Sequence, residues 1–137
     1  MISLDDLFQG SFIMVNKTMI KVLGLEASVM LGELYSEYNY WKENNGLTEN
    51  GYFYSTRENV ENNTGLSRAK QDRAINVLES VGVIKKYIYG MPAKRYFKFV
   101  QEGIEDLRMF MDSEEKKSGK VPEESANKVV NNFQAYW

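Results

Sequence analysis

Two short helical patterns meet at the tetrapeptide Thr64-Gly65-Leu66-Ser67, and this junction limits the chain to few folds. Thr56 has a side chain suited to a helix N-cap, so a first helix is predicted over residues 57–63. Ser67 is a second N-cap, and the helix that it opens is expected to end at about residue 80. Glycine in the tetrapeptide lets the chain reverse between the two helices. The pattern therefore predicts a helix-turn-helix.

The chain changes to β-strand character after Gly82. Residues 83–89 are rich in Val, Ile and Tyr, as strands are. Residues 90–93 contain Gly and Pro, which favour a turn, and residues 96–99 have the pattern of a returning strand. A β-hairpin directly after a helix-turn-helix is typical of a winged helix. The expected fold class is therefore α+β and mostly helical, a winged helix-turn-helix with a β-hairpin wing.

The outward face of the second helix follows from its periodicity. At about 100° per residue, Leu78 lies at the centre of the buried side, with Ala74 and Ile75 beside it. Gln71 falls on the buried side as well, so we exclude it from base contacts. Arg73 and Asn76 both lie on the side of the helix opposite Leu78. In a major groove their side chains can bond guanine and adenine, respectively. The alternative interpretation is a packing helix with a hydrated, charged outer face.

Further candidate contacts surround this face. Arg68 and Lys70 lie near the helix N-terminus, where phosphates are the expected partners. Cations of the hairpin are expected to meet the DNA backbone or the minor groove. Strand alternation separates Lys86 from Lys85, and only one of these two strand faces can be core. The predicted DNA-binding residues are Thr56, Arg57, Ser67, Arg68, Ala69, Lys70, Arg73, Asn76, Lys85, Lys86, Lys94 and Arg95.

Positive charge is concentrated in the same region. Residues 65–98 hold eight basic and two acidic side chains, a net charge of +6 within a chain of net charge −2. Residues 1–64 carry −5 and residues 99–137 carry −3. A local positive field attracts polyanions whatever the total charge is. A chance run of solvated lysines is the alternative, but its coincidence with the helix-turn-helix favours double-stranded DNA as the partner.

The composition argues against catalysis. The chain contains no histidine and no cysteine, which removes the common zinc ligands, disulfides and Ser-His or Cys-His pairs. It has no glycine-rich phosphate-binding loop, and no pair of carboxylates stands out from a solvated surface. We therefore expect that the chain is not an enzyme, and that it has no catalytic residue and binds no metal and no cofactor. The absence of a long apolar run and of a secretory pattern predicts a cytoplasmic protein without a membrane partner.

The flanking segments set the expected domain boundaries. Helices are predicted over residues 18–23 and 25–41, and the spacing of the aromatic residues in the longer helix favours core over a base-stacking platform. Residues 1–100 are assigned to the winged-helix DNA-binding domain. Residues 101–137 are expected to contain an amphipathic helix and then a polar linker over 112–128. The aromatic ending suggests the start of a truncated second domain.

Several motifs together resemble a known family. They are Tyr52–Glu58, Thr64–Ser67, Ala74-Ile75, Leu78-Glu79 and Gly82–Ile84, with Val15–Lys17 and Leu23–Ala27 upstream. This combination resembles the N-terminal winged-helix domain of replication initiators of Gram-positive phages and plasmids, which include replisome organisers and the RepA-type and DnaD-type initiators. The resemblance covers roughly residues 12–100. It implies binding to origin repeats, often as a homodimer, and recruitment of helicase-loading machinery through a separate C-terminal domain that is missing here.

Two other functions stay open at the level of sequence. A winged-helix transcriptional regulator would bind operator repeats through the same surface. A winged-helix module for protein–protein interaction or oligomerisation would instead use the acidic N-terminal part and the aromatic-rich helix, and would not need the face formed by residues 68–73. The better match of residues 12–54 to the initiators favours sequence-specific DNA binding in phage or plasmid replication initiation.

Overall fold

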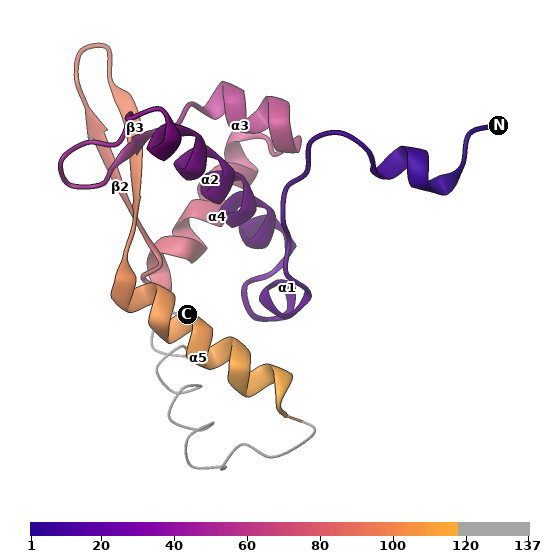
Figure 1. The fold of residues 1–137 in the computed structure, drawn as a ribbon. Coiled ribbons are helices and arrows are strands. Elements are labelled where there is room, and N and C mark those ends of the chain that lie inside the picture. The colour runs from indigo at the N-terminus through magenta and orange to yellow at the C-terminus, as the bar shows by residue number, and fades with distance from the viewer. Residues whose placement is uncertain (118–137) are drawn as a thin grey trace.

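A computed structural model describes residues 1–117 of the chain. Its elements, in chain order, are the 3-10 helix η1 (Leu4–Phe8), α1 (Lys17–Leu23), α2 (Leu25–Glu43), β1 (Phe53–Tyr54), α3 (Arg57–Thr64), α4 (Arg68–Ser80), β2 (Ile84–Tyr89), β3 (Lys94–Phe99) and α5 (Gln101–Glu115). The fold is α+β and mostly helical. Its helix-turn-helix of α3 and α4, followed by the β2–β3 hairpin, is consistent with a winged helix (Figure 1).

The three strands form one antiparallel sheet in the order β1-β3-β2. Phe53 of β1 pairs with Phe97 of β3, and Ile84 of β2 pairs with Phe99. Paired residues project to the same side of a sheet, so these apolar side chains share one face. The ring of Tyr38 in α2 meets Phe53 and Phe99 edge-on, with ring centroids 5.9 and 5.5 Å apart. The inner face of the sheet therefore packs against the helices.

Helix α2 lies at the centre of the core, with α4 packed along it (Figure 1). Met30 and Leu34 of α2 have no exposed surface, and neither do Val60 of α3 and Leu78 of α4. Burial of an apolar side chain of this size contributes about 1.5–3 kcal/mol. Both helices of the helix-turn-helix are thus held by the same apolar cluster.

The helices begin and end close to their predicted boundaries, except at the C-terminal side. The sequence predicts a polar linker from residue 112, whereas α5 continues to Glu115. Leu107 and Met111 are buried, and they fix these last turns on the core. The predicted linker beyond residue 117 and the aromatic ending lie outside the described residues. No helix within residues 1–117 is long and apolar enough to span a membrane.

Two glycines allow α5 to approach the end of α4. Gly82 has a φ of +81°, a left-handed conformation that turns the chain from α4 toward β2. Gly103 of α5 lies over this turn, and a Cβ on Gly103 would collide with the carbonyl group of Gly82. The Val100 amide donates a hydrogen bond to the Val83 carbonyl at 2.9 Å and closes the same junction. The contact is therefore possible only without a side chain at Gly103.

We expect Gly103→Ala to lower the free energy of unfolding by about 1–3 kcal/mol, because the added methyl group overpacks a backbone contact. The better helix propensity of alanine offsets part of this loss, by about 1 kcal/mol. Thermal unfolding followed by circular dichroism measures the change. Glu105→Ala, at an exposed position of the same helix, is the matched control. Equal stability of Gly103→Ala and the wild type would show that this contact does not hold α5.

Candidate nucleic-acid interface

The helix-turn-helix is capped as the sequence predicts. The hydroxyl group of Thr56 accepts a hydrogen bond from the Asn59 amide at 3.1 Å, and the hydroxyl group of Ser67 accepts one from the Lys70 amide at 3.3 Å. Gly65 ends α3 in the left-handed conformation, with a φ of +76°. Thr56 and Ser67 are thus engaged in helix capping, which positions the first turn of each helix.

Gln71 holds the turn from within. Its side chain is fully buried, and Nε2 donates hydrogen bonds to the carbonyl groups of Arg57 at 3.0 Å and Leu66 at 2.9 Å. One side chain of α4 therefore joins the first residue of α3 to the turn. Its placement on the buried side of α4 is confirmed.

The opposite side of α4 is open to solvent. The exposed residues on it are Arg68, Ala69, Lys70, Arg73 and Asn76. The orientation of α4 predicted from its periodicity is thus confirmed. The guanidinium of Arg73 lies 3.3 Å from the carboxylate of Glu26 at the start of α2, and 61% of the Arg73 side chain is exposed. An ion pair this exposed contributes little to stability, so Arg73 can leave it at little cost.

Arg57 is held by a partner in α4. It forms an ion pair with Asp72, and its own side chain is 33% exposed. The hydrogen bond from Arg57 lowers the pKa of Asp72, and the positive charge of Lys86 on β2 lowers it further. Lys86 pairs with Phe97 in the sheet, so its side chain lies on the inner face, the side of the sheet that packs against the helices.

The position of Arg95 corrects one sequence prediction. The sequence suggests a surface cation beside the hairpin turn, but Arg95 is only 6% exposed. Its Nε donates to the Ser55 carbonyl at 3.2 Å, and its terminal nitrogens donate to the Gln71 side-chain oxygen at 3.5 Å. Arg95 is two residues from Phe97 on β3, so strand alternation turns both side chains inward. Arg95 is therefore removed from the proposed DNA contacts.

The β2–β3 hairpin extends past the helices (Figure 1). Only Ile84 of β2 is buried, and residues 85–89 are exposed on both faces, so neither face of this strand is core beyond Ile84. Alternation places Lys85 and Lys94 on the outer face of the sheet and Lys86 on the inner face. The predicted hairpin cations are therefore divided between two faces because the hairpin leaves the body of the protein.

Tyrosines surround the outer lysines, a feature of this surface that was not predicted from the sequence. The Nζ atom of Lys94 lies 5.6 Å from the ring centroid of Tyr54, and that of Lys98 lies 5.6 Å from the ring centroid of Tyr52. The signal available in the sequence is the alternation within residues 85–89, which places one lysine and two tyrosines on the same face.

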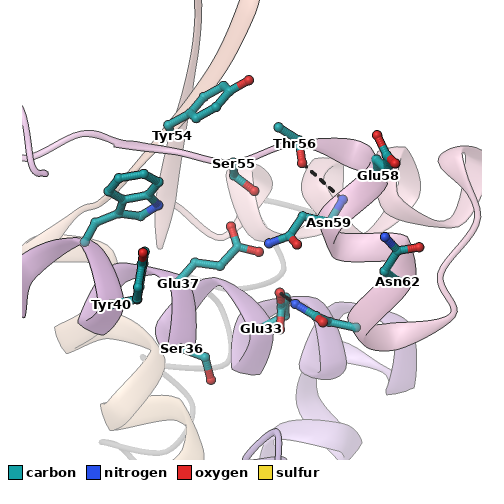
Figure 2. A pocket seen from close by; sticks show the side chains of 12 residues that line it. Glu33, Ser36, Glu37, Tyr40, Tyr54, Ser55, Thr56, Glu58, Asn59 and Asn62 are labelled. Carbon is teal, nitrogen blue, oxygen red and sulfur yellow. Dashed lines mark hydrogen bonds between the residues drawn. The ribbon is translucent and has the colours of Figure 1, made fainter. Parts of the chain in front are cut away.

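A polar pocket of about 650 Å³ lies between α2 and α3. Figure 2 shows the side chain of Glu37 directed toward Ser55 and Asn59. Glu37 is 8% exposed, and neither of its carboxyl oxygens has a hydrogen-bond partner among the described residues. Burial raises the pKa of Glu37 to about 8, and the neighbouring carboxyl group of Glu33 also raises it. Glu37 is therefore mostly protonated at neutral pH.

This carboxyl group makes stability depend on pH. Its pKa is higher in the folded chain, about 8, than the ordinary value of 4.5, so the folded state binds more protons between these values. Its contribution to stability is therefore complete below about pH 4.5 and is lost as the pH rises through about 8.

We expect Glu37→Gln to flatten the fall in thermal midpoint between about pH 5 and pH 8, and to be more stable than the wild type at the upper end, because glutamine does not ionise. Thermal unfolding across this range measures the effect. Glu43→Gln, at an exposed position of the same helix, should retain the slope of the wild type. Parallel profiles for Glu37→Gln and the wild type would contradict the assignment.

The described residues offer no metal-binding cluster. Within residues 1–117, no three acidic side chains converge so that they could hold a metal ion. The described surface combines an exposed helix face with cations on the hairpin, an arrangement suited to binding a polyanion. The expectation that the chain is not an enzyme stays a prediction.

Comparisons with known proteins find likeness at the level of the fold. No protein-family model and no curated protein sequence matches the chain. One similar solved structure is described as the N-terminal domain of a DNA binding protein; it is 14% identical, with a TM-score of 0.56, over 96% of this chain and 92% of that one. A second is described as the structure of a Rep-DNA complex; it is also 14% identical, with a TM-score of 0.56, over 96% of this chain and 93% of that one.

Proposed function

We propose that this chain binds duplex DNA sequence-specifically and acts in the initiation of phage or plasmid replication. Helix α4 enters the major groove, and the β2–β3 hairpin contacts the sugar–phosphate backbone beside it. The observation that carries the proposal is the exposed face of α4, where two cations in the first turn precede Arg73 and Asn76. A major groove about 12 Å wide admits such a helix.

Arg73 and Asn76 read the base edges in this proposal. They lie three residues apart, so they are neighbours on the same face of α4. The guanidinium can bond guanine with two hydrogen bonds, and the amide can bond adenine in the same way. Arg73 exchanges its exposed partner, Glu26, for a base when DNA binds.

Phosphates are bound around this pair of residues. Arg68 and Lys70 lie in the first turn of α4, where free backbone amides add to the positive potential. Lys86 supplies a cation from the side of the hairpin that faces α4. Arg95 has a different role, because its buried guanidinium fixes the hairpin rather than meeting DNA.

The replication role is supported by the likeness of the fold to a Rep protein in complex with DNA and by the resemblance of residues 12–54 to phage and plasmid initiators. The proposal includes a homodimer on origin repeats and helicase-loading machinery recruited through a region C-terminal to this domain. A transcriptional regulator on operator repeats is the second candidate, because it would use the same face of α4. Selecting the tightest-binding sequences from a pool of random duplexes tests both candidate functions. A directly repeated motif in the selected sequences favours an initiator.

Arg73→Ala should weaken binding to a selected duplex by about 1–3 kcal/mol and relax the preference at one base pair. The reason is loss of a bidentate contact to a base edge. Fluorescence anisotropy with the selected duplex and its single-base variants measures both effects. Glu26→Ala is the matched control, since it removes the partner of Arg73 but leaves the guanidinium in place. An unchanged preference in Arg73→Ala would remove this residue from the reading face.

Lys86→Ala should weaken binding to every duplex by a similar factor. It should also reduce the slope of the logarithm of the binding constant against the logarithm of the salt concentration by about 1. The expected cause is loss of a phosphate contact. Binding constants at several salt concentrations, for a selected and an unrelated duplex, measure the slope. Lys21→Ala, an exposed lysine of α1, is the control and should leave the slope unchanged. A loss confined to the selected duplex would contradict the assignment of Lys86 to phosphate.

A further inference from the structure

The outer face of the sheet carries an unusual set of side chains. We call it the tyrosine–lysine face, and it consists of Tyr52, Tyr54, Tyr87, Tyr89, Tyr96, Lys85, Lys94 and Lys98. The register of the strands defines it, because Tyr54 pairs with Tyr96 and Tyr96 pairs with Tyr87. Paired residues share a face, and this face is opposite to that of Phe97. It is distinct from the exposed side of α4.

The rings on this face contact one another. Tyr87 and Tyr89 are nearly parallel, with an angle of 16° between the rings and 5.9 Å between the centroids. Tyr52 lies 5.8 Å from Tyr87, and Tyr54 lies 5.6 Å from Tyr96. The rings therefore form two groups of contacting tyrosines, and the pairing of Tyr96 with Tyr87 places the two groups next to each other on the same face.

This aromatic surface remains accessible where the hairpin leaves the helices. Tyr87 and Tyr89 are 50% and 64% exposed, which is high for large aromatic side chains. Large exposed apolar surfaces commonly mark sites of interaction.

Its charge is of one sign. The three lysines lie among the tyrosines, with Lys94 over the ring of Tyr54 and Lys98 over the ring of Tyr52. Strands β1, β2 and β3 contain no aspartate or glutamate. A partner that complements this face must therefore offer flat apolar groups together with negative charge.

We propose that the tyrosine–lysine face binds single-stranded nucleic acid. Unpaired bases stack on the tyrosine rings, and the phosphates between them meet the lysines. A duplex is a poor partner, because its bases are already stacked and paired and rings lying along a sheet cannot reach their faces. The site lies on the opposite side of the sheet from Lys86, so it goes beyond the proposed duplex binding and does not depend on it.

The test is fluorescence anisotropy of the full chain with labelled oligo(dT) and oligo(rU) of 15 nucleotides, compared with a random duplex. We expect Tyr87→Ala combined with Tyr89→Ala to weaken binding to the single strands by at least about tenfold, because each ring stacks a base. Tyr87→Phe combined with Tyr89→Phe should bind as the wild type does, because stacking requires the ring and not the hydroxyl group. Equal affinity for oligo(dT) and oligo(rU) would assign the site to single-stranded DNA and RNA alike. A higher affinity for one of them would show which of the two nucleic acids the site binds.

Arg73→Ala separates this proposal from the proposed duplex binding. It should weaken binding to a selected duplex and leave oligo(dT) binding unchanged, whereas the double alanine variant should do the reverse. Absence of oligo(dT) binding by the wild type at low salt would overturn the proposal, as would undiminished binding by a double alanine variant that retains the circular dichroism spectrum of the wild type. A variant that loses self-association in sedimentation but keeps its affinity for oligo(dT) would also overturn it and identify the face as a contact between copies.

Discussion

The buried guanidinium of Arg95 joins the parts of this fold on which the proposed interface depends. A charge inside a protein is costly unless its hydrogen bonds are satisfied. Arg95 meets this requirement through the carbonyl of Ser55, which precedes α3, and through Gln71 of α4. Gln71 in turn donates to carbonyl groups at the start of α3 and in the turn. One polar cluster thus ties the hairpin to both helices of the helix-turn-helix.

This cluster explains why the two sides of the sheet differ. Because Arg95 and Phe97 point inward, the residues that alternate with them on β3 must point outward. The inner side of the hairpin then brings Lys86 toward α4, where a cation suits phosphates that flank a helix in the major groove. The outer side receives the tyrosines and the remaining lysines. The same alternation that removes one cation from the proposed duplex contacts creates the second surface.

A second buried ionisable group lies next to this arrangement. The charge of Arg95 lowers the pKa of Glu37, but burial outweighs it and keeps the carboxyl group protonated at neutral pH. The pKa of Arg95 is itself lowered to about 10, again chiefly by burial. Desolvation therefore dominates both groups, and they do not form a direct ion pair. Helix α2 contributes Glu37, so this second buried group lies beside the polar cluster, on the helix at the centre of the core.

Local sequence rules were sufficient for the helices, their caps, the turn and the outward face of α4, because each depends on residues a few positions apart. The same rules predicted the hairpin, although they did not show how far it extends beyond the core. Tertiary structure alone decided which cations are buried or paired within the protein and which stay available to a partner. Arg95 is buried against Ser55, and Arg73 pairs with Glu26, each across 40 or more positions of the chain. Such contacts depend on how distant elements pack, and no spacing within one helix or strand encodes them.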